Sequence, residues 1–382
     1  MKIGINARLL VDGKMDGIGW FAYETLRRIV ELHPEHQFIY FFDRLFHDKF
    51  ITSNNITPVV LQPQARHPLL WYLFFEFSIP RALNKYRPDL FFSPDGFLSL
   101  NTRVPSVSVL HDLAYEHFPE QVPYLGRKFY RYYMPRYARK AVRLGTVSEY
   151  SKQEIARHYH IDPAKIDVVY NGANKAYGPV AAEVQEMTRK KYTRGAPYFI
   201  FIGGMYPRKN LKRLLLGFNE FKQHDEQGIK LLVIGRAAYK SDEIMVTHEA
   251  IHHKEDVYFL GRINGEEEVR NLLASAMAMT YVSLFEGFGI PVLEAMRSGV
   301  PVITSRSSSL PEVAGEAAVY CDPFSINDIA AAMQKVAEDP ELRQKMSKMG
   351  FEQEQKFSWD RSARLLWQCI EKSFSGLPNL QT

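Results

Sequence analysis

One stretch, Met277–Ser305, constrains the fold of this chain more than any other. Its apolar, β-branched start at Met277–Ser283 predicts a strand, and a loop with two glycines follows at Glu286–Ile290. Pro291–Ser298 has the pattern of a helix that proline opens and glycine closes. Val300–Thr304 predicts a second strand. This order forms a parallel-sheet unit, so the sequence indicates an α/β fold.

The loop and the helix start predict a site for an anion. Free backbone amides and the positive end of the helix dipole attract a phosphate, and glycines let a ligand approach the main chain. Because the proline at the helix start has no amide, we expect the donors to be the amides of Gly289, Ile290 and Val292. The stretch therefore predicts a bound phosphate group.

Two acidic residues, Glu286 and Glu294, flank this anion site. Carboxylates would repel a phosphate unless they bind something else, and hydroxyl groups are their natural partners. A phosphate between two polyols describes a nucleoside diphosphate sugar, with ribose on one side and the transferred sugar on the other. The alternative is that Glu294 only complements the helix dipole and that Glu286 is a solvated loop residue.

The segment Glu286-Gly-Phe-Gly-Ile-Pro-Val-Leu-Glu294 resembles the paired-glutamate motif of the retaining glycosyltransferases of family 4, the group 1 glycosyltransferases. The resemblance implies the α/β fold called GT-B, with two Rossmann-like domains whose parallel sheets face each other across a cleft. A length of 382 residues also favours two domains. We expect an acceptor-binding domain at 1–176, a nucleotide-sugar-binding domain at 177–356, and a last helix at 357–382 that crosses back to the first domain.

The resemblance also implies roles for individual residues. Glu294 would bind the ribose hydroxyls, and Glu286 the hydroxyls of the transferred sugar. Arg208 and Lys209, after a predicted strand, would clamp the diphosphate, and His111, at the end of another strand, would lie beside the transferred sugar. A histidine there can donate to a sugar hydroxyl or stabilise developing charge. The other residues expected to contact the donor are Gly17, Gly19, Gly261, Arg262, Ile263, Gly287, Phe288, Gly289 and Ile290.

The second domain departs from the family at one point. Some members carry an arginine directly after the strand glycine, where this chain has Gly204, and Arg208 is the candidate to replace it. The segments Ser307–Pro311 and Ala318–Asp322 are expected to complete the sheet of this domain. The chain has no Asp-x-Asp, so we expect no metal ion and no cofactor at the diphosphate.

Positive charge is concentrated in the first half of the chain, where residues 1–176 hold 23 lysines and arginines against 17 aspartates and glutamates. Much of the excess lies in Arg127–Arg143, where basic residues alternate with aromatic ones and no acid occurs. This pattern suits an anionic membrane surface or a lipid-linked acceptor, and nucleic acid is not expected. The alternative is a helix with aromatic residues in the core and solvated charges.

Two observations bear on the cellular compartment. Cys321 and Cys369 are the only cysteines, which fits a reducing cytoplasm. The first residues contain Asn6 and Arg8 and predict a buried strand rather than a signal peptide, and no apolar run approaches the ~20 residues that span a bilayer. We expect a cytoplasmic protein that is peripheral to the inner face of a membrane.

A rival pattern, His248-Glu249-Ala-Ile-His252, matches the zinc metalloprotease signature of two histidines one helical turn apart. A module that binds nucleotide sugars without catalysis is a second rival. We favour a retaining, metal-independent glycosyltransferase of cell-surface polysaccharide biosynthesis. The segments Pro207–Leu211 and Gly287–Glu294 most resemble those of mannosyltransferases of surface-polysaccharide assembly. GDP-mannose is therefore the expected donor, and a glycan or lipid-linked glycan is the expected acceptor.

Overall fold

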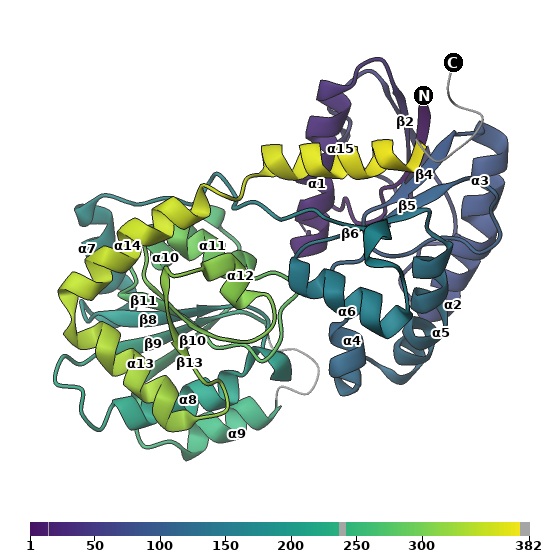
Figure 1. Cartoon of the computed structure of the whole chain (residues 1–382). Helices are drawn as coiled ribbons and strands as arrows, with labels where there is room; N and C mark the ends of the chain where they lie inside the picture. Colours follow the sequence, from purple (N-terminus) through teal and green to yellow (C-terminus); the bar gives the residue numbers. More distant parts are fainter. Residues whose placement is uncertain (14, 237–241, 375–382) are drawn as a thin grey trace. The chain divides into compact units, whose positions relative to one another are not determined.

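The computed structural model describes residues 1–13, 15–236 and 242–374, and it divides the chain into two compact units (Figure 1). The first unit contains residues 1–171 and the chain from Trp359 onward, and the second contains Gly172–Ser358. We expected the boundaries after residues 176 and 356, and the structure places them after residues 171 and 358. None of the described helices is both long and apolar enough to cross a membrane.

The first unit is built on a seven-stranded parallel sheet with the order β3-β2-β1-β4-β5-β6-β7. Its strands are β1 (Lys2–Asn6), β2 (Gln37–Phe42), β3 (Ile56–Val60), β4 (Leu90–Ser93), β5 (Ser106–Val109), β6 (Arg143–Thr146) and β7 (Ile166–Val168). The main helices are α1 (Gly17–Leu32), α2 (Pro68–Leu73), α3 (Ile79–Tyr86), α4 (Ala114–His117), α5 (Tyr124–Lys140), α6 (Glu149–Tyr159) and α15 (Trp359–Phe374). A π-helical turn, η2 (Phe74–Ser78), joins α2 to α3. Short 3-10 turns are η1 (Asp48–Phe50), η3 (Pro119–Gln121) and η4 (Pro163–Lys165).

The last helix, α15, packs on α1 of the first unit (Figure 1). Trp367 stacks on His33 with ring centroids 3.8 Å apart, and Arg28 forms an ion pair with Asp360. The apolar face of this amphipathic helix is buried against the unit, which stabilises its position. The return of the final helix to the first domain, expected from the family resemblance, is confirmed.

The second unit is built on a six-stranded parallel sheet with the order β10-β9-β8-β11-β12-β13. Its strands are β8 (Tyr198–Ile202), β9 (Lys230–Ile234), β10 (Val257–Gly261), β11 (Ala278–Tyr281), β12 (Val302–Ser305) and β13 (Ala318–Cys321). Its helices are α7 (Ala182–Thr193), α8 (Leu211–Phe221), α9 (Asp242–Ala250), α10 (Glu266–Ala274), α11 (Ile290–Arg297), α12 (Leu310–Ala314), α13 (Ile326–Glu338) and α14 (Pro340–Glu354). The 3-10 turns are η5 (Pro207–Lys209) and η6 (Lys254–Asp256).

The strand, loop, helix and strand unit predicted around the glycine loop is present as β11, α11 and β12, and both strands are buried. The prediction of a strand at Ser307–Pro311 is wrong, because this segment is a turn that leads into α12. Ser308 has a positive φ of 51°, and Pro311 has no amide for a strand ladder, so neither residue suits a central strand.

The strand order places two loops of the second unit beside each other. β8 and β11 are neighbours in the sheet, while the chain continues from β8 to β9 on one side and from β11 to β12 on the other. Open parallel sheets bind ligands at the carboxyl ends of the strands where the order reverses in this way. The loops that follow β8 and β11, residues 203–210 and 282–289, therefore define the place to look for a site.

Candidate functional site

Backbone and amide contacts join the loops after β8 and β11. The amide of Leu284 donates to the carbonyl of Arg208 at 2.8 Å. The buried side chain of Asn210 donates to the carbonyls of Val282, at 3.0 Å, and Pro323, at 2.7 Å. Asn210 itself adopts a left-handed conformation with φ of 61°, which asparagine tolerates better than most residues. The basic residues before it are therefore held on a fixed frame.

Three charged side chains form an ion network between these loops. The ammonium of Lys209, which is buried, lies 2.6 Å from Oε1 and 2.7 Å from Oε2 of Glu286 and also donates to the hydroxyl of Tyr281. Nη1 of Arg208 lies 3.2 Å from Oε2 of the same carboxylate and 3.1 Å from the carbonyl of Phe285. The structure thus brings together Arg208, Lys209 and Glu286, all three predicted as site residues.

The electrostatics of this network favour its charged form. Burial alone would raise the pKa of Glu286, but the nearby charges of Lys209 and Arg208 outweigh it and lower the pKa to about 2. Two cations and one anion leave a net charge of about +1 at the mouth of the sheet. A second anion, such as a diphosphate, would complete the neutralisation that Glu286 begins.

Serines that the sequence analysis did not single out hold the glycine loop. Oγ of Ser308 accepts from the amide of Glu286 at 2.8 Å. Oγ of Ser309 lies 2.9 Å from the carbonyl of Glu286 and 2.8 Å from that of Phe288. The only sequence signal was their place directly after a strand in the unit where the motif lies. Their hydrogen bonds fix the direction in which the loop's main chain points.

Within the loop, the fold explains the residue types at positions 288 and 289 in different ways. The ring of Phe288 is buried and packs edge-on against Phe357, with centroids 5.6 Å apart, so only its main chain can face a ligand. Gly289 has φ of 113°, and a Cβ atom there would lie 2.9 Å from Cδ2 of Leu310. Glycine at 289 is therefore required by the fold, as well as suited to a close ligand approach.

One expected phosphate donor is engaged elsewhere. The amide of Val292, which we predicted to face a phosphate, donates to the carbonyl of Gly289 at 3.0 Å. This hydrogen bond spans three residues, so α11 begins with a tight turn of the 3-10 type. The prediction for Val292 is corrected, and the amides of Gly289 and Ile290 remain the predicted donors.

The second acid of the motif, Glu294, lies half-buried on α11. Within the described ranges its carboxylate makes no hydrogen bond or ion pair. Burial, reinforced by the negative charge of Glu266, raises the pKa of Glu294 to about 8. The hydroxyl of Tyr177 lies near Glu294. Burial and the negative charge of Glu294 raise the pKa of this hydroxyl. A half-buried carboxylate without donors is suited to receive hydroxyl groups from a ligand.

The remaining predicted residues of the second unit lie at strand ends. Gly261 ends β10, with φ of 64°, and its carbonyl accepts from the amide of Gly235 at 2.9 Å. Arg262 follows in an exposed position and Ile263 in a half-buried one. These positions are at the carboxyl edge of the sheet, and their contact with the donor stays a prediction.

Space for a side chain is limited at Gly204, the position where some members of the resembled family carry arginine. A Cβ atom at this position would lie 2.9 Å from Cε2 of Tyr206, so an arginine would have to displace that ring. The guanidinium of Arg208 lies 5.8 Å from the centre of the same ring. Arg208 therefore occupies the neighbourhood of Tyr206, and its replacement of the missing arginine stays a prediction.

In the first unit, His111 follows β5 at the carboxyl edge of its sheet. Its Nε2 lies 2.8 Å from the carbonyl of Pro94, and its ring packs edge-on against Phe21. Burial lowers the pKa of His111, so the imidazole is neutral and its proton lies on Nε2. Nδ1 is then an acceptor. In this tautomer Nδ1 can accept a hydrogen bond from a hydroxyl but cannot donate one. The expected place of His111 beside the transferred sugar stays a prediction.

The two glycines of the first unit that were predicted to contact the donor differ in exposure and in packing. Gly17 is exposed at the start of α1. The amide of Gly19 donates to Oδ1 of Asp16 at 3.0 Å, which caps the helix, and a Cβ atom there would lie 3.1 Å from the carbonyl of Leu9. Capping and close packing account for glycine at position 19. The expected donor contacts of Gly17 and Gly19 both stay predictions.

The zinc protease pattern does not form the expected pair of ligands. α9 ends at Ala250, so His252 lies beyond the helix and does not share a face with His248. Nε2 of His248 lies 3.2 Å from the carbonyl of Lys254, and Glu249 pairs with the ammonium of that lysine at 2.9 Å. The local structure contradicts this alternative, because the metalloprotease geometry needs both histidines on one helix.

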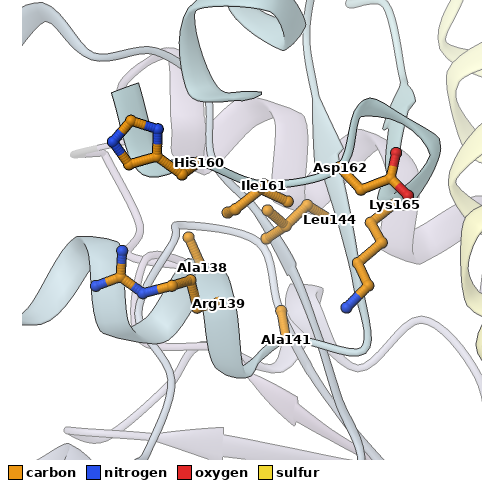
Figure 2. A pocket seen from close by; sticks show the side chains of 8 residues that line it. All are labelled: Ala138, Arg139, Ala141, Leu144, His160, Ile161, Asp162 and Lys165. Atoms are coloured by element: carbon orange, nitrogen blue, oxygen red, sulfur yellow. The ribbon is translucent and has the colours of Figure 1, made fainter. Parts of the chain in front are cut away.

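A small cavity of about 110 Å³ in the first unit lies at a different place (Figure 2). It is lined by Ala138, Arg139, Ala141, Leu144, His160, Ile161, Asp162 and Lys165. These residues surround the starts of β6 and β7, at the sheet edge opposite to the one that carries His111. The ends of α5 and α6 meet there, so the basic side chains complement two negative helix ends. The cavity is not part of the predicted site.

Comparisons with known proteins identify glycosyltransferases as relatives of this chain. Residues 184–353 match the family described as Glycosyl transferases group 1, and residues 15–177 match Glycosyltransferase Family 4. The chain is 27% identical over 372 residues to O-antigen chain mannosyltransferase B of Escherichia coli, covering 94% of this chain and 97% of that protein. It is 27% identical over 292 residues to O-antigen chain mannosyltransferase RfbU of Salmonella typhimurium, covering 76% and 77%.

Among solved structures, Anabaena HepE in complex with UDP and glucose superposes with a TM-score of 0.74. The two chains are 18% identical, and the superposition covers 97% of this chain and all of the other. At this identity the likeness concerns the fold alone, and it confirms the two-domain fold expected from the sequence.

Replacing Lys209 with methionine should strongly destabilise the second unit. The variant would leave the carboxylate of Glu286 buried without its closest cation, and breaking such a pair costs about 3–5 kcal/mol. The double variant Lys209→Met/Glu286→Gln should recover much of this loss, because no buried charge is left unpaired by it. Guanidinium unfolding of the single and double variants measures both effects. The exposed pair of Lys212 with Glu243 supplies the control Lys212→Met, and a Lys209→Met loss no larger than that control would contradict the network.

Replacing Glu294 with glutamine should stabilise the protein in a pH-dependent way. A folded pKa of about 8 lies above the ordinary 4.5, so the folded state holds its proton more tightly than the unfolded state. The cost of ionising Glu294 therefore appears as pH rises above 4.5 and is complete above 8. Glu294→Gln should match the wild type in stability at pH 5. At pH 8.5 its melting temperature should be higher, and its free energy of unfolding should be larger by a few kcal/mol at most.

The measurement is thermal unfolding at both pH values. Glu352→Gln, on the exposed side of α14, is the matched control and should show no difference at either pH. Equal melting temperatures for Glu294→Gln and the wild type at pH 8.5 would show that the carboxylate is compensated.

Proposed function

We propose that this chain, which belongs to the group 1 and family 4 glycosyltransferases, transfers mannose from GDP-mannose to a glycan or lipid-linked acceptor with retention of configuration. The observation that carries the proposal is the pairing of a cationic network with an unpartnered acid. Arg208, Lys209 and Glu286 lie on one side of the glycine loop, and Glu294 lies on the helix that follows it. A diphosphate between two polyols matches this order of groups.

The relatives support the choice of sugar. Two of them, matched over most of their length, are named O-antigen mannosyltransferases. An O-antigen chain is a surface polysaccharide, so we assign this chain to cell-surface polysaccharide biosynthesis.

In the proposed reaction, the second unit binds the donor. The cations of Arg208 and Lys209 and the amides at the start of α11 stabilise charge that develops on the departing diphosphate, which is the largest catalytic effect we assign. The ammonium of Lys209 already donates hydrogen bonds to Glu286 and Tyr281. A bound diphosphate must therefore compete with Glu286 for the ammonium, while Glu286 turns toward the hydroxyls of the sugar.

The bond changes balance without a protein nucleophile. The bond between the anomeric carbon and the phosphate oxygen breaks, the acceptor oxygen bonds to that carbon from the same face, and the acceptor's proton passes to the departing phosphate. For the first unit we propose acceptor binding, with neutral His111 receiving a hydroxyl hydrogen bond at Nδ1. The cations supply the charge at the diphosphate, so we propose that no metal ion is required.

The transfer is tested with GDP-mannose and a mannoside that carries a hydrophobic tail, in buffer with EDTA. We expect a product whose new linkage is α, as in the donor, when its anomeric proton is read by nuclear magnetic resonance. Arg208→Ala should lower turnover by about 10²-fold, since it removes one preorganised cation but leaves Glu286 paired with Lys209. The control Lys212→Ala should retain full turnover.

Three outcomes would contradict the proposal in different ways. An inverted linkage would exclude the same-face reaction, and activity that disappears with EDTA would exclude metal independence. Tight GDP binding with no transfer to several such acceptors would favour the alternative of a binding module.

We further propose that the first unit contacts an anionic membrane. Six large apolar side chains are exposed on α2, η2 and α5: Leu69, Leu73, Phe77, Tyr124, Leu125 and Tyr132. α2 and α5 are neighbours, with the rings of Trp71 and Tyr130 stacked 5.6 Å apart. The core accounts for Phe129 and Tyr137 but not for these six, so the alternative of a simple amphipathic helix explains only part of α5.

The charges of α5 fit the same partner. Arg136 lies over the ring of the exposed Tyr132 at 3.7 Å, and Lys128 lies over that of Tyr124 at 4.6 Å. Cations beside exposed aromatic rings suit the boundary between lipid headgroups and acyl chains. This surface would place the protein at the inner face of the membrane, where a lipid-linked acceptor would be within reach.

Vesicle sedimentation tests the contact. The protein should sediment with vesicles that contain phosphatidylglycerol, less so as salt is raised, and not with vesicles of phosphatidylcholine alone. Leu125→Ser/Tyr132→Ser should lower the bound fraction several-fold. The control Met187→Ser/Val246→Ser changes two residues of the second unit that are more exposed than Leu125 and Tyr132, and it should have no effect. Equal binding to both kinds of vesicle, or to neither, would contradict the proposal.

A further inference from the structure

Two histidine side chains of the first unit converge on one carboxylate oxygen of a third residue, and none of the three has a role in the proposed transfer. His117, at the end of α4, places Nε2 2.6 Å from Oε2 of Glu154 on α6. His158, one helical turn along α6, places Nε2 3.3 Å from the same oxygen. The ligand atoms of the three residues all lie within 4.8 Å of one another. We propose that His117, Glu154 and His158 form a binding site for a divalent zinc-type ion, and we call them the α4–α6 cluster.

The spacing of the α4–α6 cluster is close to that of a zinc site. Bonds of about 2.0–2.2 Å in a tetrahedron place ligand atoms about 3.3–3.5 Å apart. The distance of 3.3 Å between His158 and Glu154 already meets this value, and that between His117 and Glu154 must open by less than about 1 Å. The two imidazole planes are inclined by 79°, so both planes can pass through one ion position.

The surroundings allow an ion to enter and be held. Glu154 is largely buried, with its side chain 13% exposed, whereas the side chains of His117 and His158 are 31% and 37% exposed. The carboxylate is thus shielded, whereas the two exposed histidines are in contact with solvent, which can supply a water molecule as the fourth ligand. Two histidines, one carboxylate and a water form a donor set that zinc commonly accepts.

The ion would add a link between two helices that already touch. The hydroxyls of Tyr115 on α4 and Tyr159 on α6 lie 2.6 Å apart, and Tyr159 also donates to Glu116 at 3.3 Å. α4 begins at Ala114, three residues after His111. An ion at the cluster would therefore stiffen the segment that follows His111, and its role would be structural.

A second group with similar residues, His33, Glu35 and His36, fits an ion less well. The rings of His33 and His36 are stacked with planes inclined by only 9°, and ring nitrogens in parallel stacked planes do not point at one position. Nδ1 of His36 also lies 3.2 Å from the N-terminal ammonium, whose charge would repel a cation. The carboxylate of Glu35 is 58% exposed and less firmly held. This group is the natural internal control.

The test is titration of the full, metal-free chain with Zn²⁺ against a chromogenic chelator, with the melting temperature as a second readout. We expect one ion per chain and a higher melting temperature. His117→Asn/His158→Asn should weaken binding at least 10-fold, and His158→Asn alone should do so if the double variant does not fold. His33→Asn/His36→Asn should bind as the wild type does.

Three outcomes would overturn the inference: no zinc bound by the folded wild type, binding unchanged in the variants of the α4–α6 cluster, or binding lost in the control. None of the three residues of the α4–α6 cluster has a role in donor binding by the second unit. Nucleotide binding by the second unit should be the same with and without zinc, so failure of either proposal is distinguishable from failure of the other.

Discussion

The buried ion pair between Lys209 and Glu286 is the interaction on which the proposed site depends. It joins the loops after two neighbouring strands, and with Arg208 it leaves about one positive charge at the carboxyl edge of the sheet. Burial would favour a neutral Glu286, but the two cations hold its pKa at about 2. The pair therefore stabilises the fold above the ordinary pKa of 4.5 and fails only as pH falls toward 2. Because Lys209 is bound to Glu286 before any ligand arrives, a diphosphate must exchange with an existing partner.

Glu294 shows the opposite arrangement in the same unit. Its carboxylate has no cation to offset burial, and Glu266 adds a negative charge, so its pKa is raised to about 8. Such a group lowers stability at neutral pH, which folding alone does not require. A ligand that donates hydroxyl groups would relieve this cost, and in this way the strain of the free protein contributes to binding. Neighbouring cations therefore keep Glu286 ionised, whereas Glu294 has no hydrogen-bond partner among the described residues and can accept hydroxyl groups from a ligand.

The sequence predicted those parts of the site that are adjacent along the chain. The glycine loop, both acids and the Arg208–Lys209 pair form local patterns with a direct physical meaning, and the two-domain α/β fold followed from them and from the resemblance. It did not predict Tyr281, Asn210, Ser308 or Ser309, because their roles come from contacts between distant segments. Local pattern also misled: Ser307–Pro311 was expected to be a strand, and His248 and His252 suggested a helical pair that α9 is too short to form. The α4–α6 cluster has no sequence signature, since 37 residues separate His117 from Glu154.

Calorimetric titration with GDP, UDP and ADP, in the presence of a chelator, tests the central claim most directly. The account predicts that GDP binds most tightly without a metal ion, and that Arg208→Ala weakens it at least 10-fold while the protein remains folded, a factor that corresponds to about 1.4 kcal/mol. No binding of any nucleotide, or equal affinity in the wild type and Arg208→Ala, would contradict the claim that these cations hold a diphosphate.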